Sequence, residues 1–329
     1  MARPRLKLGF DNYSIRAFGW KAPQLLEYAA SLKLDTVLFS DLDVYESLSD
    51  SYLRGIKSKA DGLGIEIQAG TGGICQASSF WNKKWGPPEE LLATTIRVAK
   101  TLGSSVARCF LGWVGDRSGP GGIRAHILSV IETCRKLRQT ALDAGVKIAI
   151  ENHAGDMQSY EVVRLINDAG PEFMAATLDT GNAVWALEDP SVTLEVLGPH
   201  ALSTGIRDSV VWETSKGAAF EWKAMGEGQV DWKTFFERYA EICPKTPVQL
   251  EIITGPPRDV PYLKDDFWGP YPDAPASGFA KYAAFARKGE APKPYKAPKG
   301  LQAEQEWQKA QLEKSVAYCR KKLGLGLKR

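Results

Sequence analysis

Three acidic residues each stand at the end of a short apolar run, and the first of them is followed at once by an amide and an imidazole. The run "IAIENHAGD" carries Glu151, Asn152 and His153, while Asp179 and Glu251 end the runs "AATLD" and "VQLE". Successive side chains of a strand alternate between its two faces. Each acid has the opposite parity from the bulky aliphatic side chains of its run. The pattern predicts that all three carboxylates point into the lumen of a barrel.

Three carboxylates that converge on one point repel one another and resist desolvation unless a cation or protons compensate. Oxygen ligands suit Mn²⁺ or Mg²⁺, and an added imidazole shifts the preference toward Mn²⁺, Co²⁺ or Zn²⁺. We therefore expect a divalent metal, with Mn²⁺ as the first choice, held by Glu151, Asp179 and Glu251. The alternative is that these are ordinary strand-end acids that face solvent or pair with Lys and Arg.

Short β-branched runs alternate with amphipathic helical stretches along the chain, and this order is typical of a parallel sheet. Eight such units favour a closed (β/α)8 TIM barrel, an α/β fold, over an open doubly wound sheet. Barrel enzymes place their chemistry at the carboxyl ends of the strands, where the three acids stand. The expected strands span residues 6–14, 35–41, 65–70, 105–112, 146–152, 174–180, 202–208 and 247–253.

The chain is divided into a barrel over residues 1–290 and a C-terminal linker and helix over residues 291–329. The helical pattern of residues 304–324 is amphipathic and is expected to pack on the barrel or on a partner subunit. This C-terminal segment is therefore the expected surface for a homo-oligomer. Residues 255–278 form a loop rich in Pro and aromatic residues, with the length of a lid or a subunit contact.

Composition limits the partners of the protein. The 42 Lys and Arg against 39 Asp and Glu leave a formal charge of +3, which indicates no nucleic-acid partner. No apolar run has the ~18 residues of a membrane span, and no apolar signal-peptide core follows the basic N-terminus. Five scattered cysteines fit reduced thiols. We expect a cytoplasmic protein with a small-molecule partner.

Five motifs together carry a family resemblance. The stretches "IAIENH", "TLDTGNAVWALEDP", "GIRDSVVWE", "MGEGQVDW" and "VQLEI" resemble the xylose-isomerase-like TIM barrel family of sugar phosphate isomerases and epimerases, over roughly residues 6–255. The resemblance implies a divalent metal bound by a Glu, an Asp, a His and a second Glu at the ends of strands five to eight. Glu151, Asp179 and Glu251 match three of these ligands.

The chain departs from the family at the fourth ligand. Gly205 stands where the resemblance implies the His of strand seven. His153 and His200 are conceivable substitutes, although a loop histidine that only forms hydrogen bonds is the simpler interpretation of each. The departure leaves either the affinity for metal or the activity open to question.

The resemblance implies a metal-dependent sugar isomerase or epimerase of carbohydrate metabolism. It acts on a keto sugar through an enediolate, with Glu151 and Glu251 as the acid/base pair. One alternative is a 3-oxo-glycoside lyase that works by β-elimination, with His153 as acid or base. A second is a non-catalytic sugar-binding barrel that has lost its metal through Gly205. The candidates for lining the carbohydrate site are Gln68, Arg108, Trp113, His153, Asn182, Trp185 and Arg207.

Overall fold

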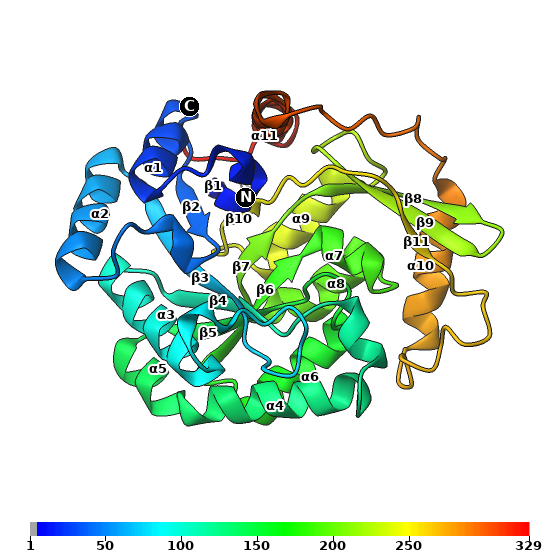
Figure 1. Cartoon of the computed structure of the whole chain (residues 1–329). Helices are drawn as coiled ribbons and strands as arrows, with labels where there is room; N and C mark the ends of the chain where they lie inside the picture. Colours follow the sequence, from blue (N-terminus) through cyan, green and yellow to red (C-terminus); the bar gives the residue numbers. More distant parts are fainter. Residues whose placement is uncertain (1–4, 329) are drawn as a thin grey trace.

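The computed structural model describes residues 5–328, in which eight parallel strands form one sheet in the order β10-β1-β2-β3-β4-β5-β6-β7. Ile206, directly after β7, forms a parallel bridge with Leu250 of β10. Its amide donates to Gln249 O at 2.8 Å, and its carbonyl accepts from the Glu251 amide at 3.1 Å. The sheet thus curves into a nearly closed barrel surrounded by helices (Figure 1). The predicted (β/α)8 fold is confirmed.

The strands are short and almost entirely buried, as expected of a barrel wall with helices outside and side chains in the lumen. All eight predicted strands are present, with ends that differ by a few residues. They are β1 (Leu8–Asp11), β2 (Thr36–Phe39), β3 (Glu66–Gly73), β4 (Val106–Phe110), β5 (Lys147–Glu151), β6 (Met174–Asp179), β7 (Ala201–Gly205) and β10 (Val248–Leu250).

The outer helices bury one apolar face each against the strands. In α3, for example, Leu92, Ile96 and Ala99 are buried, and the helix ends at Gly103, whose φ of +73° favours glycine. The helices around the barrel are α1 (Ala22–Ser31), α2 (Asp50–Leu63), α3 (Pro88–Leu102), α4 (Gly122–Lys136), α5 (Arg138–Ala144), α6 (Ser159–Ala169), α7 (Thr180–Trp185), α8 (Pro190–Leu197) and α9 (Trp232–Ile242). Short 3-10 turns are η1 (Asn12–Phe18), η2 (Leu42–Val44), η3 (Lys83–Trp85), η4 (Val114–Ser118) and η5 (Gly198–His200).

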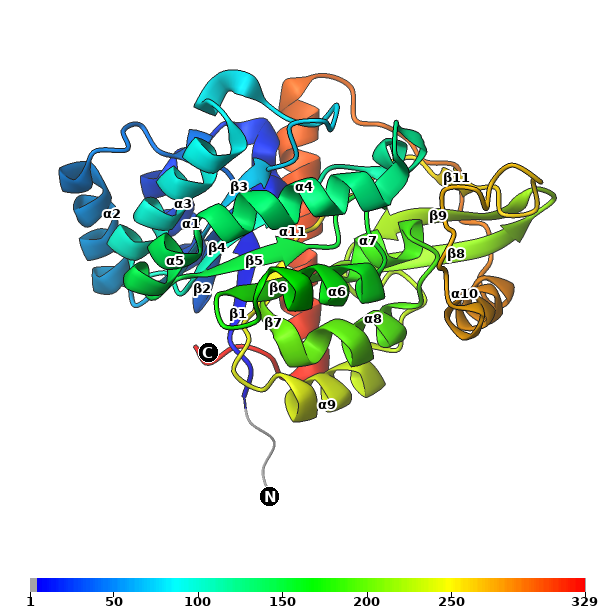
Figure 2. The same cartoon turned by 90° about the horizontal axis from the view of Figure 1, so that it is seen from below.

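A second, antiparallel sheet lies beside the barrel, where sequence reasoning expected no strands. It consists of β8 (Asp208–Thr214), β9 (Gly217–Lys223) and β11 (Arg258–Val260) in the order β11-β9-β8. Figures 1 and 2 show it extending to one side with α10 (Ala276–Lys288) packed along it. It forms a separate apolar cluster with α10, to which Phe220 and Trp222 belong. The segment expected to be an irregular loop therefore contains β11 and leads into this layer.

The last helix, α11 (Leu301–Leu323), packs on the barrel. Leu312, Val316 and Cys319 of this helix are buried in the barrel core cluster, and Gln308 accepts a hydrogen bond from the Ala17 amide at 2.9 Å. The helix was expected to pack either on the barrel or on a partner subunit, and in this structure it packs on the barrel. Over residues 5–328, no helix is both long and apolar enough to cross a membrane.

Candidate active site at the mouth of the barrel

Three buried carboxylates meet at the carboxyl ends of the strands. Glu151 ends β5, Asp179 ends β6 and Glu251 directly follows β10, with exposed fractions of 2%, 0% and 6%. Each residue offers a carboxylate oxygen, and these oxygens lie within 4.8 Å of one another. The structure thus brings together the three acids that strand parity placed in the lumen. We refer to them as the acidic group.

Asn152 explains why a buried strand ends on a polar run. Its side-chain amide donates to Asp179 O at 2.9 Å, and its side-chain oxygen accepts from the Asp179 amide at 2.9 Å. The side chain therefore ties the end of β5 to the end of β6. Asp179 in turn caps α7, because its Oδ1 accepts from the Asn182 amide at 2.5 Å. These bonds fix the positions of two members of the acidic group.

The guanidinium of Arg207 lies inside the acidic group. It donates to Asp179 Oδ1 at 3.0 Å and to Asn182 Oδ1 at 2.9 Å, and it forms a short ion pair with Glu251 Oε2. The Trp222 ring centroid lies 4.3 Å from the guanidinium carbon. Arg207 is only 1% exposed, so its charge is balanced almost entirely by these carboxylates.

A second guanidinium holds the remaining carboxylate. Arg108 Nε donates to Glu151 Oε2 at 2.6 Å, and Arg108 also donates to Thr71 O at 3.1 Å. The Asn182 side-chain amide donates to Glu151 Oε1 at 3.2 Å. Three carboxylates thus face two guanidinium groups. The acidic group carries one negative charge more than these two guanidinium groups if its three acids are ionised.

Burial and charge shift the pKa values of these acids in different directions. Burial raises the pKa of Glu151 to about 7, although Arg108 opposes the shift. Burial also raises the pKa of Asp179 well above its usual value. For Glu251, attraction to Arg207 and Arg108, together with a hydrogen bond to Asp179, outweighs burial and lowers the pKa to about 2. Glu251 is therefore the member most readily ionised.

His153 lies beside the acidic group but outside the set of side chains that could bind a metal. Its Nδ1 donates to Gly112 O at 2.6 Å, and its ring stacks on Phe110 with centroids 3.7 Å apart. Burial and nearby Arg108 lower the pKa of His153 to about 3, so the ring is neutral. His200 lies in η5, which precedes β7, and so it is at the opposite end of that strand from the acidic group.

The two predicted tryptophans belong to aromatic clusters at this end of the barrel. The ring centroids of Trp113 and Phe80 lie 5.7 Å apart, and Trp113 Nε1 donates to Ser79 Oγ at 2.8 Å. Trp185 lies 5.7 Å from Trp222, the ring that packs on Arg207. Trp185 is linked to the acidic group through Trp222 and Arg207. Trp113 packs with Phe80, which lies 5.9 Å from His153 between ring centroids.

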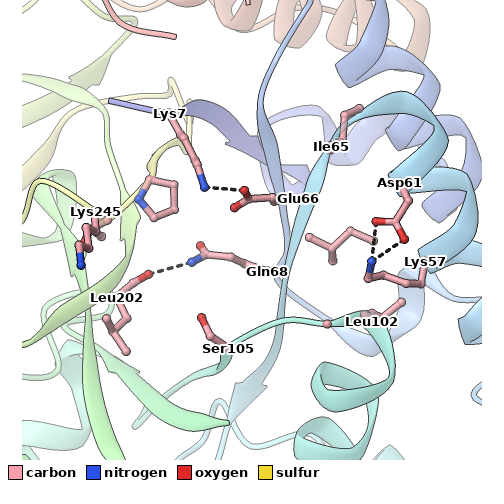
Figure 3. Close-up of a pocket in the computed structure, with 14 residues that line it drawn as sticks. Lys7, Lys57, Asp61, Ile65, Glu66, Gln68, Leu102, Ser105, Leu202 and Lys245 are labelled. Atoms are coloured by element: carbon pink, nitrogen blue, oxygen red, sulfur yellow. Dashed lines mark hydrogen bonds and ion pairs between the residues drawn. The ribbon is translucent and has the colours of Figure 1, made fainter. Parts of the chain in front are cut away.

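The structure does not bring Gln68 to the acidic group. Gln68 is near the start of β3, where its amide donates to Leu202 O at 2.8 Å and its oxygen accepts from Ser203 Oγ at 2.8 Å. Figure 3 shows it pointing into a cavity of about 390 Å³ together with Lys7 and Ser105. That cavity is at the amino ends of the strands. Gln68 was expected to line the carbohydrate site at the end of its strand, but it lies near the start of β3.

Gly205 leaves no room for the imidazole that the resemblance implied. A Cβ atom at this position would lie 2.3 Å from Asp179 Oδ2 and 3.2 Å from Glu251 Oε2. The carboxylates therefore occupy the space into which a side chain would extend. A ligand at position 205 would require Asp179 to move.

Sequence reasoning missed Trp222 and Gly181, which hold Arg207 in place. Trp222 lies on β9, a strand that was not expected, although the alternation of Ala218, Phe220 and Trp222 was a signal for one. Gly181 was read only as part of a turn, although a Cβ there would lie 2.0 Å from Arg207 Nε. Position 181 requires glycine because of its contact with Arg207, which belongs to another segment of the chain.

The family profile described as "Xylose isomerase-like TIM barrel" matches residues 26–265. The chain belongs to the xylose isomerase-like TIM barrel family. This confirms the resemblance that the five motifs indicated.

Three known proteins are similar to this chain. A D-psicose 3-epimerase, crystallised in the presence of D-fructose, is 18% identical, with a TM-score of 0.64 over 97% of this chain and 100% of that one. The IolI protein with a bound zinc atom is 14% identical, with a TM-score of 0.59 over 95% and 98% of the two chains. The uncharacterized protein YihM of Escherichia coli strain K12 is 23% identical over 187 residues, which are 57% of this chain and 51% of YihM.

At these identities the two solved structures establish the fold of this xylose isomerase-like barrel. The aligned part spans about half the length of YihM. What the chain itself contributes is a buried acidic group that could hold a divalent metal.

Proposed function

We propose that this xylose isomerase-like barrel is an enzyme that moves a proton next to the carbonyl group of a keto sugar, as a metal-dependent isomerase or epimerase. The observation that carries the proposal is the convergence of Glu151, Asp179 and Glu251 at the carboxyl mouth of the barrel. The similarity to a sugar 3-epimerase over nearly the whole chain supports it. The substrate is a small carbohydrate, and nucleic acid and membrane are not partners.

Glu151 and Glu251 are the proposed acid/base pair. The two buried carboxyls differ in pKa, about 7 for Glu151 and about 2 for Glu251, so near neutral pH Glu151 can be protonated while Glu251 is ionised. Removal of a proton by one and return by the other to the opposite face inverts the carbon, which is epimerisation. Return to the neighbouring carbon is isomerisation.

The residues present fit a divalent cation. Asp179 Oδ2 is buried and accepts no hydrogen bond from an amide, guanidinium or hydroxyl group of the described residues, and the acidic group exceeds its two guanidinium partners by one charge when all three of its acids are ionised. Glu151, Asp179 and Glu251 would hold the ion, and their oxygen ligands favour Mn²⁺ or Mg²⁺, with Mn²⁺ as our choice. Its chemistry there is to offset the negative charge that develops on the carbonyl oxygen as the proton leaves.

The remaining side chains orient the sugar. Asn182, Arg108 and Arg207 contact the acidic group directly and are the proposed partners of substrate hydroxyl and carbonyl oxygens. His153, Trp113 and Trp185 are the proposed neighbours of the sugar at the mouth. We also propose a cytoplasmic location, because all five cysteines are buried and free, as suits a reducing compartment.

The test is solvent-deuterium exchange into a panel of ketoses, followed by NMR in the presence of Mn²⁺. The wild type is expected to place deuterium on the carbon next to the carbonyl of one of them. Glu151→Gln and Glu251→Gln are expected to lower this rate by about 10²-fold or more, because each removes a group that carries the proton.

Glu66→Gln is the matched control, because Glu66 starts β3 and pairs with Lys7 at the opposite end of the barrel. Its exchange rate is expected to equal that of the wild type. Exchange at the wild-type rate in both site variants would remove Glu151 and Glu251 from the mechanism. No exchange with any ketose would favour a non-catalytic sugar-binding barrel.

His153 supports a second candidate, a 3-oxo-glycoside lyase. Since its Nδ1 donates to Gly112 O, the neutral ring has its Nε2 lone pair available as a base. The same enolisation, performed on a 3-oxo-glycoside, expels the substituent on the anomeric carbon. Release of that substituent, without deuterium exchange into any ketose, would favour the lyase.

A further inference from the structure

Arg207 has a position built for it within the acidic group. On one side, Gly181 leaves room for its side chain, since a Cβ there would lie 2.0 Å from Nε. On another, the Trp222 ring lies 4.3 Å from the guanidinium carbon, and Trp222 Nε1 donates to Gly181 O at 2.7 Å. Gly181 and Trp222 are therefore joined to each other as well as to Arg207. The guanidinium is held by surrounding structure and is not a freely rotating surface side chain.

The bonds of Arg207 use the carboxylates that a divalent ion would need. Its two terminal nitrogens bind Asp179 Oδ1 and Glu251 Oε2, which takes one oxygen from each of two residues in the acidic group. A metal ion that binds both residues would meet the guanidinium at close range. Two cations at such a distance repel strongly in a site with little water.

Arg108 provides the comparison within the same site. It is also a buried arginine and pairs with a member of the acidic group, Glu151. It forms no hydrogen bond or ion pair with Asp179 or Glu251 among the described residues, and its Nη1 donates instead to the Thr71 carbonyl. Loss of either arginine changes the charge of the site equally, but loss of Arg207 alone also vacates the space between two carboxylates.

We propose that Arg207 is the resident cation of this site, and that a divalent ion binds Asp179 and Glu251 only when the Arg207 guanidinium moves away. The inference rests on the proposed function in one respect, namely that the acidic group is where the metal binds. In the wild type the metal and the guanidinium compete, so the affinity for metal is weak. Arg207 is a positioning residue that holds the two carboxylates in register while no metal is bound.

The test is calorimetric titration with Mn²⁺ of the wild type, Arg207→Gln and Arg108→Gln. Arg207→Gln is expected to bind Mn²⁺ about tenfold more tightly than the wild type, or better. Arg108→Gln is expected to change the affinity less, because it removes the same charge without vacating the position. An equal increase in Mn²⁺ affinity in both variants would overturn the proposal, since the loss of one positive charge from the site would then explain the increase without any vacated position.

Thermal denaturation covers the case in which Arg207→Gln is too unstable to titrate, because unpaired buried carboxylates destabilise a fold. Mn²⁺ is expected to raise its melting temperature more than it raises that of the wild type, and Arg207→Lys is expected to restore the wild-type response. Equal, tight binding in all proteins would overturn the resident-cation proposal and leave a metal-dependent reaction standing. If none of these proteins binds Mn²⁺, the metal and Arg207 do not compete. The proposed function would then also lose its metal.

Discussion

At the scale of single residues, the site is defined by which atoms occupy a small buried volume. Gly205 and Gly181 both stand where a Cβ would collide with a charged side chain, Asp179 in one case and Arg207 in the other. Neither glycine has a positive φ, so space and not backbone conformation is the reason for them. Because glycine has no side chain at either position, the Asp179 carboxylate and the Arg207 guanidinium have room to contact each other.

Gly205→Ala is expected to destabilise the protein by about 1–3 kcal/mol, as overpacking of a buried site does. The new methyl group would lie 2.3 Å from Asp179 Oδ2 and force that carboxylate to move. Denaturant unfolding measures the effect. Gly255→Ala is the control, because nothing lies within 4 Å of a Cβ there. A Gly205→Ala protein as stable as the control would mean that Asp179 moves freely.

Strand parity predicted the direction of Glu151, Asp179 and Glu251, because alternation depends on local backbone geometry alone. The role of Arg207 was beyond that reasoning. The sequence placed Arg207 among the candidates for lining the carbohydrate site, but its position between two carboxylates depends on Gly181 and Trp222, which are distant in sequence or lie in an unexpected strand. Gln68 shows a related limit, because the sequence did not give the true end of β3, which extends to Gly73 and leaves Gln68 near its start.

At the scale of elements, a buried carboxylate joins α6 to the connection between α7 and α8. Glu188 accepts hydrogen bonds from the Ser159 amide at 3.0 Å, from Ser159 Oγ at 2.7 Å and from Thr193 Oγ1 at 3.1 Å. Ser159 begins α6 and Thr193 belongs to α8. The acid therefore positions the helices that follow β5 and β6, the strands that carry Glu151 and Asp179.

This contact predicts a pH-dependent stability. Burial raises the pKa of Glu188 from 4.5 to about 7, against the opposing hydrogen bonds from Ser159. Between these values the folded chain retains a proton that the unfolded chain has lost. The contribution of Glu188 to the free energy of unfolding therefore falls as pH rises from 4.5 to 7, by about 1.4 kcal/mol for each pH unit.

Glu188→Gln does not titrate, so the stability difference between wild type and variant isolates this residue. Denaturant unfolding across the window should show the wild type losing stability relative to Glu188→Gln as pH rises. A difference that is constant across the window, or that grows in favour of the wild type, would contradict a raised pKa for Glu188.

The eight barrel strands were predictable because each is a short apolar run bounded by turn residues. The sheet of β8, β9 and β11 was not expected, for two physical reasons. Its strands pair antiparallel outside the regular alternation of strand and helix, and β11 is separated in sequence from its partner β9 by α9 and β10. A three-residue strand such as β11 has no periodicity of its own.

At the scale of the whole molecule, two additions to the barrel, the antiparallel sheet and α11, pack against segments that follow barrel strands. The sheet of β8, β9 and β11 contributes Trp222 beneath Arg207, and Arg258 of β11 lies 4.2 Å from the same ring. On the other side, α11 packs near η1, where Gln305 donates to Ala17 O at 3.0 Å. The antiparallel sheet thus packs on Arg207, and α11 packs on the segment that follows β1.

The central claim is that Glu151 and Glu251 exchange protons with a keto sugar held at the mouth of this barrel. It is tested most directly by a crystal structure grown with Mn²⁺ and the ketose that shows deuterium exchange. We expect the carbon next to the sugar carbonyl to lie within reach of both carboxylates, with Mn²⁺ bound to the acidic group and Arg207 moved away from Asp179. A sugar whose reacting carbon faces neither Glu151 nor Glu251, or that binds away from this end of the barrel, would contradict it.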